Sequence, residues 1–158
     1  MNAGLAAVWF YHLGSVYKVD RAFRANWGKE DDYLGGIVDQ EHRPHPVYEV
    51  HRIYGQTKGQ TRLEAKGCTA TMGALASKGT TGGLEVLLGS IDKVTQAVTI
   101  EVANAPAGPA SVEVKVLGGQ GKAEVVTVTV ERRDGKLRIV LPKVAPDRAY
   151  HVTLGTTK

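Results

Sequence analysis

Residues 33–55, YLGGIVDQEHRPHPVYEVHRIYG, separate two parts of the chain whose sequence patterns differ. The small apolar residues at 34–38 predict a short strand or a turn, and the charged residues at 39–43 predict a loop. An amphipathic helix is expected to follow over residues 44–55. The segments on either side of this stretch have the patterns of two different architectures.

The predicted helix begins with prolines and has one apolar face. Pro44 and Pro46 suit the first turn, where the missing backbone N–H would have no intrahelical partner in any case. Gly55 is expected to end the helix. The apolar residues recur at the spacing of a single helical face, and they are Val47, Val50, Ile53 and Tyr54.

Residues 1–14, MNAGLAAVWFYHLG, form a nearly continuous apolar run. Such a run is typical of a strand that is buried on both faces, as in a parallel barrel, and a mainly buried helix is the alternative. Residues 15–32 have a mixed pattern that predicts either a weakly amphipathic helix or an irregular loop.

From Arg62 onward the apolar residues alternate with polar ones, which is the period of a strand with one buried face. The alternating segments are 84–88, 98–102, 112–116, 126–130, 137–141 and 150–154, and further strands are expected at 62–66 and 69–77. Asp134-Gly135 predicts a two-residue hairpin turn. About eight short strands separated by Gly, Pro and Asn turns predict an antiparallel β-sandwich.

The order of these features resembles the end of the catalytic barrel in clan A glycoside hydrolases, and most closely that of family 39, which is β-xylosidase-like. The motif is Gly-Gly-Ile-Val-Asp, a polar turn, Arg-Pro-x-Pro and an aromatic-rich helix. In this resemblance, residues 8–11 stand for the last barrel strand and residues 44–55 for the final barrel helix.

The resemblance and the strand pattern together predict a mainly β fold. An antiparallel β-sandwich of about eight strands is expected at 59–158. It would be preceded, at 1–58, by a small α/β segment (strand, loop and helix) that resembles the last β/α unit of a TIM barrel.

The composition excludes several classes of protein. The 158 residues have a formal net charge of +4, and the basic residues are spread out, so neither a nucleic-acid partner nor a membrane partner is expected. The apolar run at 5–13 is too short to cross a bilayer, and no basic residue precedes it as in a signal peptide. We expect a soluble protein, cytoplasmic or secreted. Cys68 is the single cysteine, which excludes an intrachain disulfide and a cysteine-based zinc site.

A retaining glycosidase uses two carboxylates about 5 Å apart, one as acid/base and one as nucleophile. The resemblance implies that both residues come from earlier barrel strands, upstream of Met1, so that this chain lacks the pair. Glu30, Asp31 and Asp32 are the weak local candidates for catalytic carboxylates. The competing interpretation is that this acidic cluster is an ordinary solvated loop.

Four residues are candidates for binding a sugar. At the end of a last barrel strand, Trp9 would offer a flat apolar platform for a sugar ring, and Tyr11 or His12 would hydrogen-bond its hydroxyls. Trp27 is a candidate stacking residue in the following loop. The competing interpretation is that Trp9 belongs to the core and that Trp27 caps the small helical part.

No metal site and no cofactor are predicted. Of the five histidines, His42, His45 and His51 lie close in sequence, but the six-residue spacing of His45 and His51 puts them off a common helical face. His151 is expected at an outward position of the last strand. No serine lies in a GxSxG elbow, and the glycine clusters fall between strands, where they serve turns.

Three functions remain open. The first is the C-terminal accessory part of a glycoside hydrolase, structural or weakly carbohydrate-binding. The second is a stand-alone hydrolase of plant-type polysaccharides or aryl-glycosides that uses carboxylates from residues 20–41. The third is a β-sandwich module for protein interaction.

An isolated barrel strand at 5–13 would be unstable. Each of its large apolar side chains loses roughly 1.5–3 kcal/mol if left in water, and the sum rivals the stability of a whole domain. We therefore expect this segment either to fold back as a helix on the sandwich or to pair with the same segment of a second copy, which would make a homo-oligomer through residues 1–14.

Overall fold

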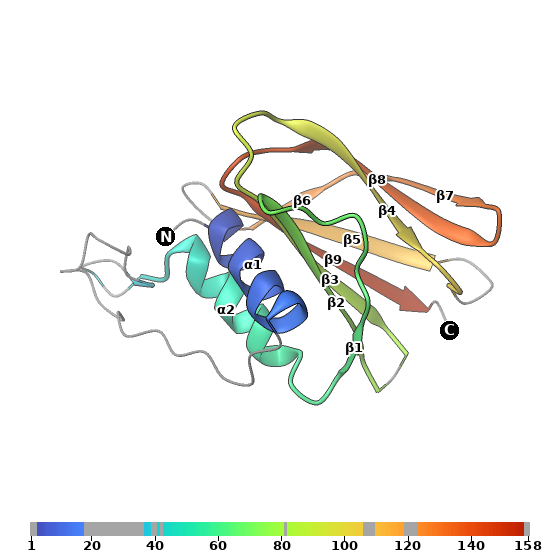
Figure 1. Cartoon of the computed structure of the whole chain (residues 1–158), viewed down its shortest axis with the longest axis horizontal. Coiled ribbons are helices and arrows are strands. Elements are labelled where there is room, and N and C mark those ends of the chain that lie inside the picture. Colours follow the sequence, from blue (N-terminus) through green and yellow to red (C-terminus); the bar gives the residue numbers. More distant parts are fainter. Residues whose placement is uncertain are drawn as a thin grey trace.

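The computed structural model describes residues 3–17, 37–38, 41, 43–80, 82–105, 110–118 and 123–156. Within them the chain forms three layers: two helices, a six-stranded sheet and a three-stranded sheet (Figure 1). The helical elements are α1 (Ala3–Tyr11), the π-helical turn η1 (His12–Val16) and α2 (Pro46–Gln56). The strands are β1 (Thr61–Leu63), β2 (Met72–Lys78), β3 (Leu84–Ser90), β4 (Gln96–Val102), β5 (Ala110–Leu117), β6 (Glu124–Val126), β7 (Thr129–Arg133), β8 (Lys136–Val144) and β9 (Ala149–Thr156).

The antiparallel β-sandwich predicted from the alternating segments is confirmed. The larger sheet has the strand order β1-β2-β3-β9-β5-β6, and the smaller has the order β4-β8-β7. One predicted strand is corrected, because 126–130 contains the end of β6 and the start of β7. These strands pair with β5 and β8, in different sheets. The alternation of apolar and polar residues continues where the chain passes from one sheet to the other, so the pattern alone does not separate the two strands.

The core between the two sheets comes from the alternating apolar residues. Val86, Val114 and Val152 occupy one row across neighbouring strands and face Ile139 and Leu141 of β8, all buried. The predicted hairpin turn at Asp134-Gly135 is also confirmed. It joins β7 to β8 with φ of 53° and 74°, as a type I′ turn requires.

The interpretation of residues 1–14 as a barrel strand is wrong, because Ala3–Tyr11 forms helix α1. The alternative, a helix folded back on the sandwich, is the one observed: α1 lies beside α2 over one face of the larger sheet (Figure 1). The run is apolar on nearly all sides because the helix is covered by the sheet on one side and by α2 on another. Pairing between two copies stays a prediction.

Glycines allow α1 to lie directly on β3. A Cβ atom at Gly4 would lie 2.8 Å from the carbonyl carbon of Asp147, and one at Gly89 would lie 2.6 Å from Cβ of Ala7. The backbone N–H of Gly4 donates to the carbonyl oxygen of Asp147 at 3.1 Å. This bond satisfies one of the N–H groups that the start of a helix leaves without an intrahelical partner.

The predicted helix at 44–55 is confirmed as α2, with Pro46 in its first turn and Val47, Val50 and Ile53 buried. Gly55 does not end it: the helix continues to Gln56, and Gly59 takes the left-handed conformation (φ 84°) in the turn that follows. None of the helices in the described ranges is long and apolar enough to span a membrane.

One hydrophobic cluster joins the helices to the sheet. It contains Ala7 and Phe10 of α1, Val50 of α2 and Leu75 and Leu87 of the sheet. Residues from both predicted parts, 1–58 and 59–158, therefore share this core. The boundary near residue 59 stays a prediction.

Two glycine replacements should have opposite effects on the free energy of unfolding, because only one of the glycines lies against α1. Gly89→Ala should lower the free energy of unfolding by about 1–3 kcal/mol, because the new Cβ pushes α1 away from β3. Gly55→Ala has no atom within 4 Å of its new Cβ and should raise it by up to about 1 kcal/mol through helix propensity. Urea unfolding measures both. A Gly89→Ala variant as stable as the wild type would contradict the packing.

Candidate functional site

The acidic candidates Glu30, Asp31 and Asp32 and the candidate stacking residue Trp27 lie outside the described residues. Their roles stay predictions.

The three candidates near the N-terminus do not converge on one surface. Trp9 is on the outer side of α1, with 37% of its surface exposed. The ring of Tyr11 lies on the opposite side, where it covers Gly73 of β2, and partial burial and the neighbouring Cys68 raise the pKa of its hydroxyl. Nε2 of His12 is 3.3 Å from the carbonyl oxygen of Ala70. Because residues 3–11 are helical, the strand end on which a shared sugar platform was expected is absent.

A different group of polar residues forms a continuous row across the six-stranded sheet. Antiparallel register places these residues beside one another on five successive strands, and they are Arg62, Ser77, Glu85, Thr153 and Glu113. On β2, β3, β9 and β5, the apolar neighbours of these residues point to the opposite face, toward the smaller sheet. The row therefore lies on the face of the sheet that also carries the helices.

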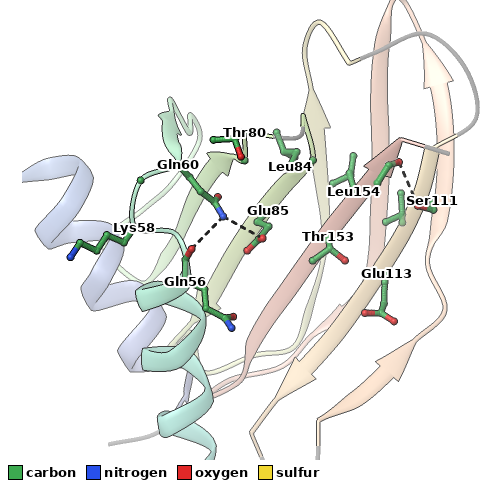
Figure 2. Close-up of a pocket in the computed structure, with 15 residues that line it drawn as sticks. Gln56, Lys58, Gln60, Thr80, Leu84, Glu85, Ser111, Glu113, Thr153 and Leu154 are labelled. Carbon is green, nitrogen blue, oxygen red and sulfur yellow. Dashed lines mark hydrogen bonds between the residues drawn. The ribbon is translucent and has the colours of Figure 1, made fainter. Parts of the chain in front are cut away.

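The helices leave part of this row uncovered. Helix α2 ends at Gln56, and the turn after it is fixed by hydrogen bonds from Thr57 Oγ1 to the Tyr54 carbonyl and from Gln60 N–H to the Thr57 carbonyl. The chain then enters β1 at the edge of the sheet. An open groove of about 720 Å³ remains between this turn and the sheet. Figure 2 shows Glu85, Thr153 and Glu113 on its floor and Gln56 and Gln60 on its rim.

Gln60 connects the rim of the groove to its floor. Its Oε1 accepts a hydrogen bond of 2.7 Å from Ser77 Oγ. Its Nε2 lies 3.5 Å from both the Gln56 carbonyl oxygen and Glu85 Oε1, as the dashed lines in Figure 2 mark. These two contacts are long for hydrogen bonds, so the amide retains donor capacity toward the groove.

Both carboxylates of the groove have a basic neighbour. Glu113 is 2.9 Å from Lys115 Nζ, and Glu85 is 3.4 Å from Nε2 of His151. Burial lowers the pKa of His151, although the hydrogen bond that its ring donates to Glu85 opposes this shift. His151 points away from the sandwich core, as expected, but only 13% of its side chain is exposed, and it lines a small cavity together with Ile53 and Tyr54 of α2.

The histidines provide no metal site in the described part of the chain, where no group of three or more His, Cys, Asp or Glu residues is arranged to hold an ion. His45 occupies the N-cap position of α2 without a side-chain capping hydrogen bond, and the ring of His51 packs edge-on against Phe10 with the ring centroids 4.9 Å apart. His42 lies outside the described residues.

The sequence pattern does not reveal the groove. Glu85 and Glu113 fall at polar positions of the alternating segments 84–88 and 112–116, and period-two alternation indicates the face of a strand but not which strands are neighbours. In the sheet, β9 lies between β3 and β5, and this order brings the two glutamates to either side of Thr153.

The sequence matches no protein-family model, and no curated protein is similar to it in sequence. Solved structures of glycoside hydrolases do share its fold. A glucosidase from Croceicoccus marinus superposes with a TM-score of 0.69 at 20% identity, over 98% of this chain and 41% of that chain. A GH51 arabinofuranosidase from Xanthomonas axonopodis pv. citri gives 0.65 at 13% identity, over 97% and 35%. A GH30 subfamily 8 xylanase from Clostridium acetobutylicum gives 0.53 at 14% identity, over 78% and 31%.

The chain thus has the fold of one part of glycoside hydrolase chains, and it spans less than half the length of each of these three. At these identities the likeness concerns the fold. It does not single out family 39.

The partly buried His151 predicts a pH-dependent stability. Because the pKa of His151 is lowered in the folded state, the unfolded chain binds the proton more readily. The free energy of unfolding should therefore be unaffected by this group well above about pH 6.5 and should decrease as the pH falls below that value. Urea unfolding at several pH values should show a smaller pH slope for His151→Gln than for the wild type. The exposed His45→Gln variant should keep the wild-type slope, and an unchanged slope in His151→Gln would contradict the assignment.

Proposed function

We propose that the chain is the C-terminal accessory portion of a glycoside hydrolase of clan A, family 39-like. In this role it contributes the last helices of the catalytic barrel and a β-sandwich, and the catalytic carboxylate pair comes from the rest of the catalytic domain. The observation that carries the proposal is that 98% of this chain superposes on only 41% of a glucosidase. The order of motifs at residues 35–55 supports family 39 in particular.

The outer surface of the helical layer supports a role within a larger protein. Leu5, Trp9 and Val16 follow one side of α1 and η1, and each exposes more than a third of its surface. Helix α1 cannot rotate to bury them, because Gly4 and Gly89 fix its other side against β3. We propose that the remaining part of the catalytic domain covers this face, since burial of apolar surface is favourable by roughly 25 cal/mol per Å².

The accessory role predicts that the chain alone does not turn over glycosides. Assays with xylan, cellulose and aryl-glycosides should show no product above the background, and a variant with Glu30→Gln, Asp31→Asn and Asp32→Asn should behave identically. Turnover that disappears in this triple variant would refute the accessory role and favour a stand-alone hydrolase, because a retaining enzyme requires its carboxylate pair.

The exposed helical face predicts that two substitutions reduce the binding of an apolar dye. The double variant Leu5→Ser, Trp9→Ser should bind an apolar fluorescent dye less than the wild type does, because it removes the exposed apolar area. Because both side chains also bury more than half of their surface, its free energy of unfolding should fall by about 1–3 kcal/mol, and far-UV circular dichroism verifies that it is folded. Val94→Ser removes an even more exposed apolar side chain (69%) in the β3–β4 loop and serves as the control. An equal loss of dye binding in this control would count against a specific docking face.

A further inference from the structure

From the polar groove of the six-stranded sheet, we infer a binding site for a neutral oligosaccharide. The inference rests on the proposed function and deepens it, because it names the place where an accessory portion of a hydrolase would hold carbohydrate. Of the sugar-binding residues predicted from the sequence, Trp9, Tyr11 and His12 do not line this groove, and Trp27 lies outside the described residues.

The spacing of the groove's polar groups suits a chain of sugar rings. Glu85, Thr153 and Glu113 occupy one row on adjacent strands, so their backbones are about 5 Å apart. This spacing is close to the length of one sugar ring. An extended oligosaccharide that lies across the strands would therefore present a new set of hydroxyl groups at each of these residues.

The charges of the groove favour a neutral ligand. The carboxylates of Glu85 and Glu113 repel phosphate and other anions. Lys115 offsets the charge of Glu113, and Lys58 also lines the groove, so the attraction for cations is reduced. The groove also lacks the group of three ligating residues that a metal ion requires, in the part of the chain that the structure describes. Hydroxyl groups can both donate to these carboxylates and accept from the neighbouring donors.

The side chains around the row supply both kinds of hydrogen-bonding group. Gln60 offers amide N–H groups whose present contacts are long, and Thr153 and Ser111 offer hydroxyls. Figure 2 shows these residues on both sides of the same opening. Its volume of about 720 Å³ is within the usual range of ligand sites.

The groove predicts weak binding. No described residue that lines it is aromatic, so a sugar ring finds no stacking platform and binding rests on hydrogen bonds that replace bonds to water. A dissociation constant of about a millimolar is expected.

The test is a titration of the full chain followed by ¹H–¹⁵N correlation spectra. The probes are xylotetraose and cellotetraose, with spermidine and calcium chloride as cationic alternatives. Addition of at least one tetrasaccharide should shift the amide signals of Gln60, Glu85 and Thr153 in a saturable manner, and the cationic probes should shift them less.

Two variants and a matched control locate the site. Glu113→Gln removes an exposed carboxylate, and Thr153→Val replaces a hydroxyl by a methyl group of similar size; each should weaken binding roughly 5–20-fold. Glu131→Gln removes an exposed carboxylate from β7, in the other sheet, and should change the affinity by less than about twofold. The spectrum of each free variant verifies that it is folded.

Four results would overturn the inference: no saturable shift with either tetrasaccharide, tighter binding of spermidine or calcium, unchanged affinity in folded Glu113→Gln and Thr153→Val, or shifts centred on Trp9. The last result would move carbohydrate binding to α1 and leave the accessory role intact. The turnover and dye experiments test that role separately, so its failure is distinguishable from a failure of the groove.

Discussion

The structure depends on the contact between helix α1 and the backbone of strand β3. Gly4 and Gly89 remove the side chains that would separate the two elements, and the first turn of α1 is anchored by the Asp147 carbonyl. Asp147 itself has a left-handed backbone (φ 62°) and donates its N–H to Ser90 at the end of β3. With α1 fixed in this way, α2 has a surface to pack on, and the two helices close the second core.

This contact also divides one face of the larger sheet into two regions. Near α1, the residues on this face of the sheet are apolar, with Gly89 and Leu117 on either side of Ala149. Two rows further along the same strands they become polar, with Glu85 beside Thr153 and Glu113. The row between them contains Leu87 and His151, which line a small cavity together with Ile53 of α2. The same strands thus provide a core at one end and a hydrogen-bonding surface at the other.

Much of the fold was predictable from local patterns, and the site was not. Alternation identified the sandwich strands, and Pro46 with the apolar stripe identified α2, because each pattern depends on neighbouring residues. The apolar run at 3–11 was misjudged because burial on several sides removes the periodicity that distinguishes a helix from a strand. The groove depends on β9 lying between β3 and β5, which is a long-range pairing that no local pattern specifies.

The short link between β6 and β7 has a mechanical consequence. Only Thr127 and Val128 separate Val126 in one sheet from Thr129 in the other. Three peptide units reach at most about 11 Å, and packed sheets lie about 10 Å apart. The link therefore has almost no slack, so the two sheets cannot slide or swing open as separate rigid bodies while β6 and β7 remain paired. Any breathing of the sandwich must begin by detaching one of these edge strands.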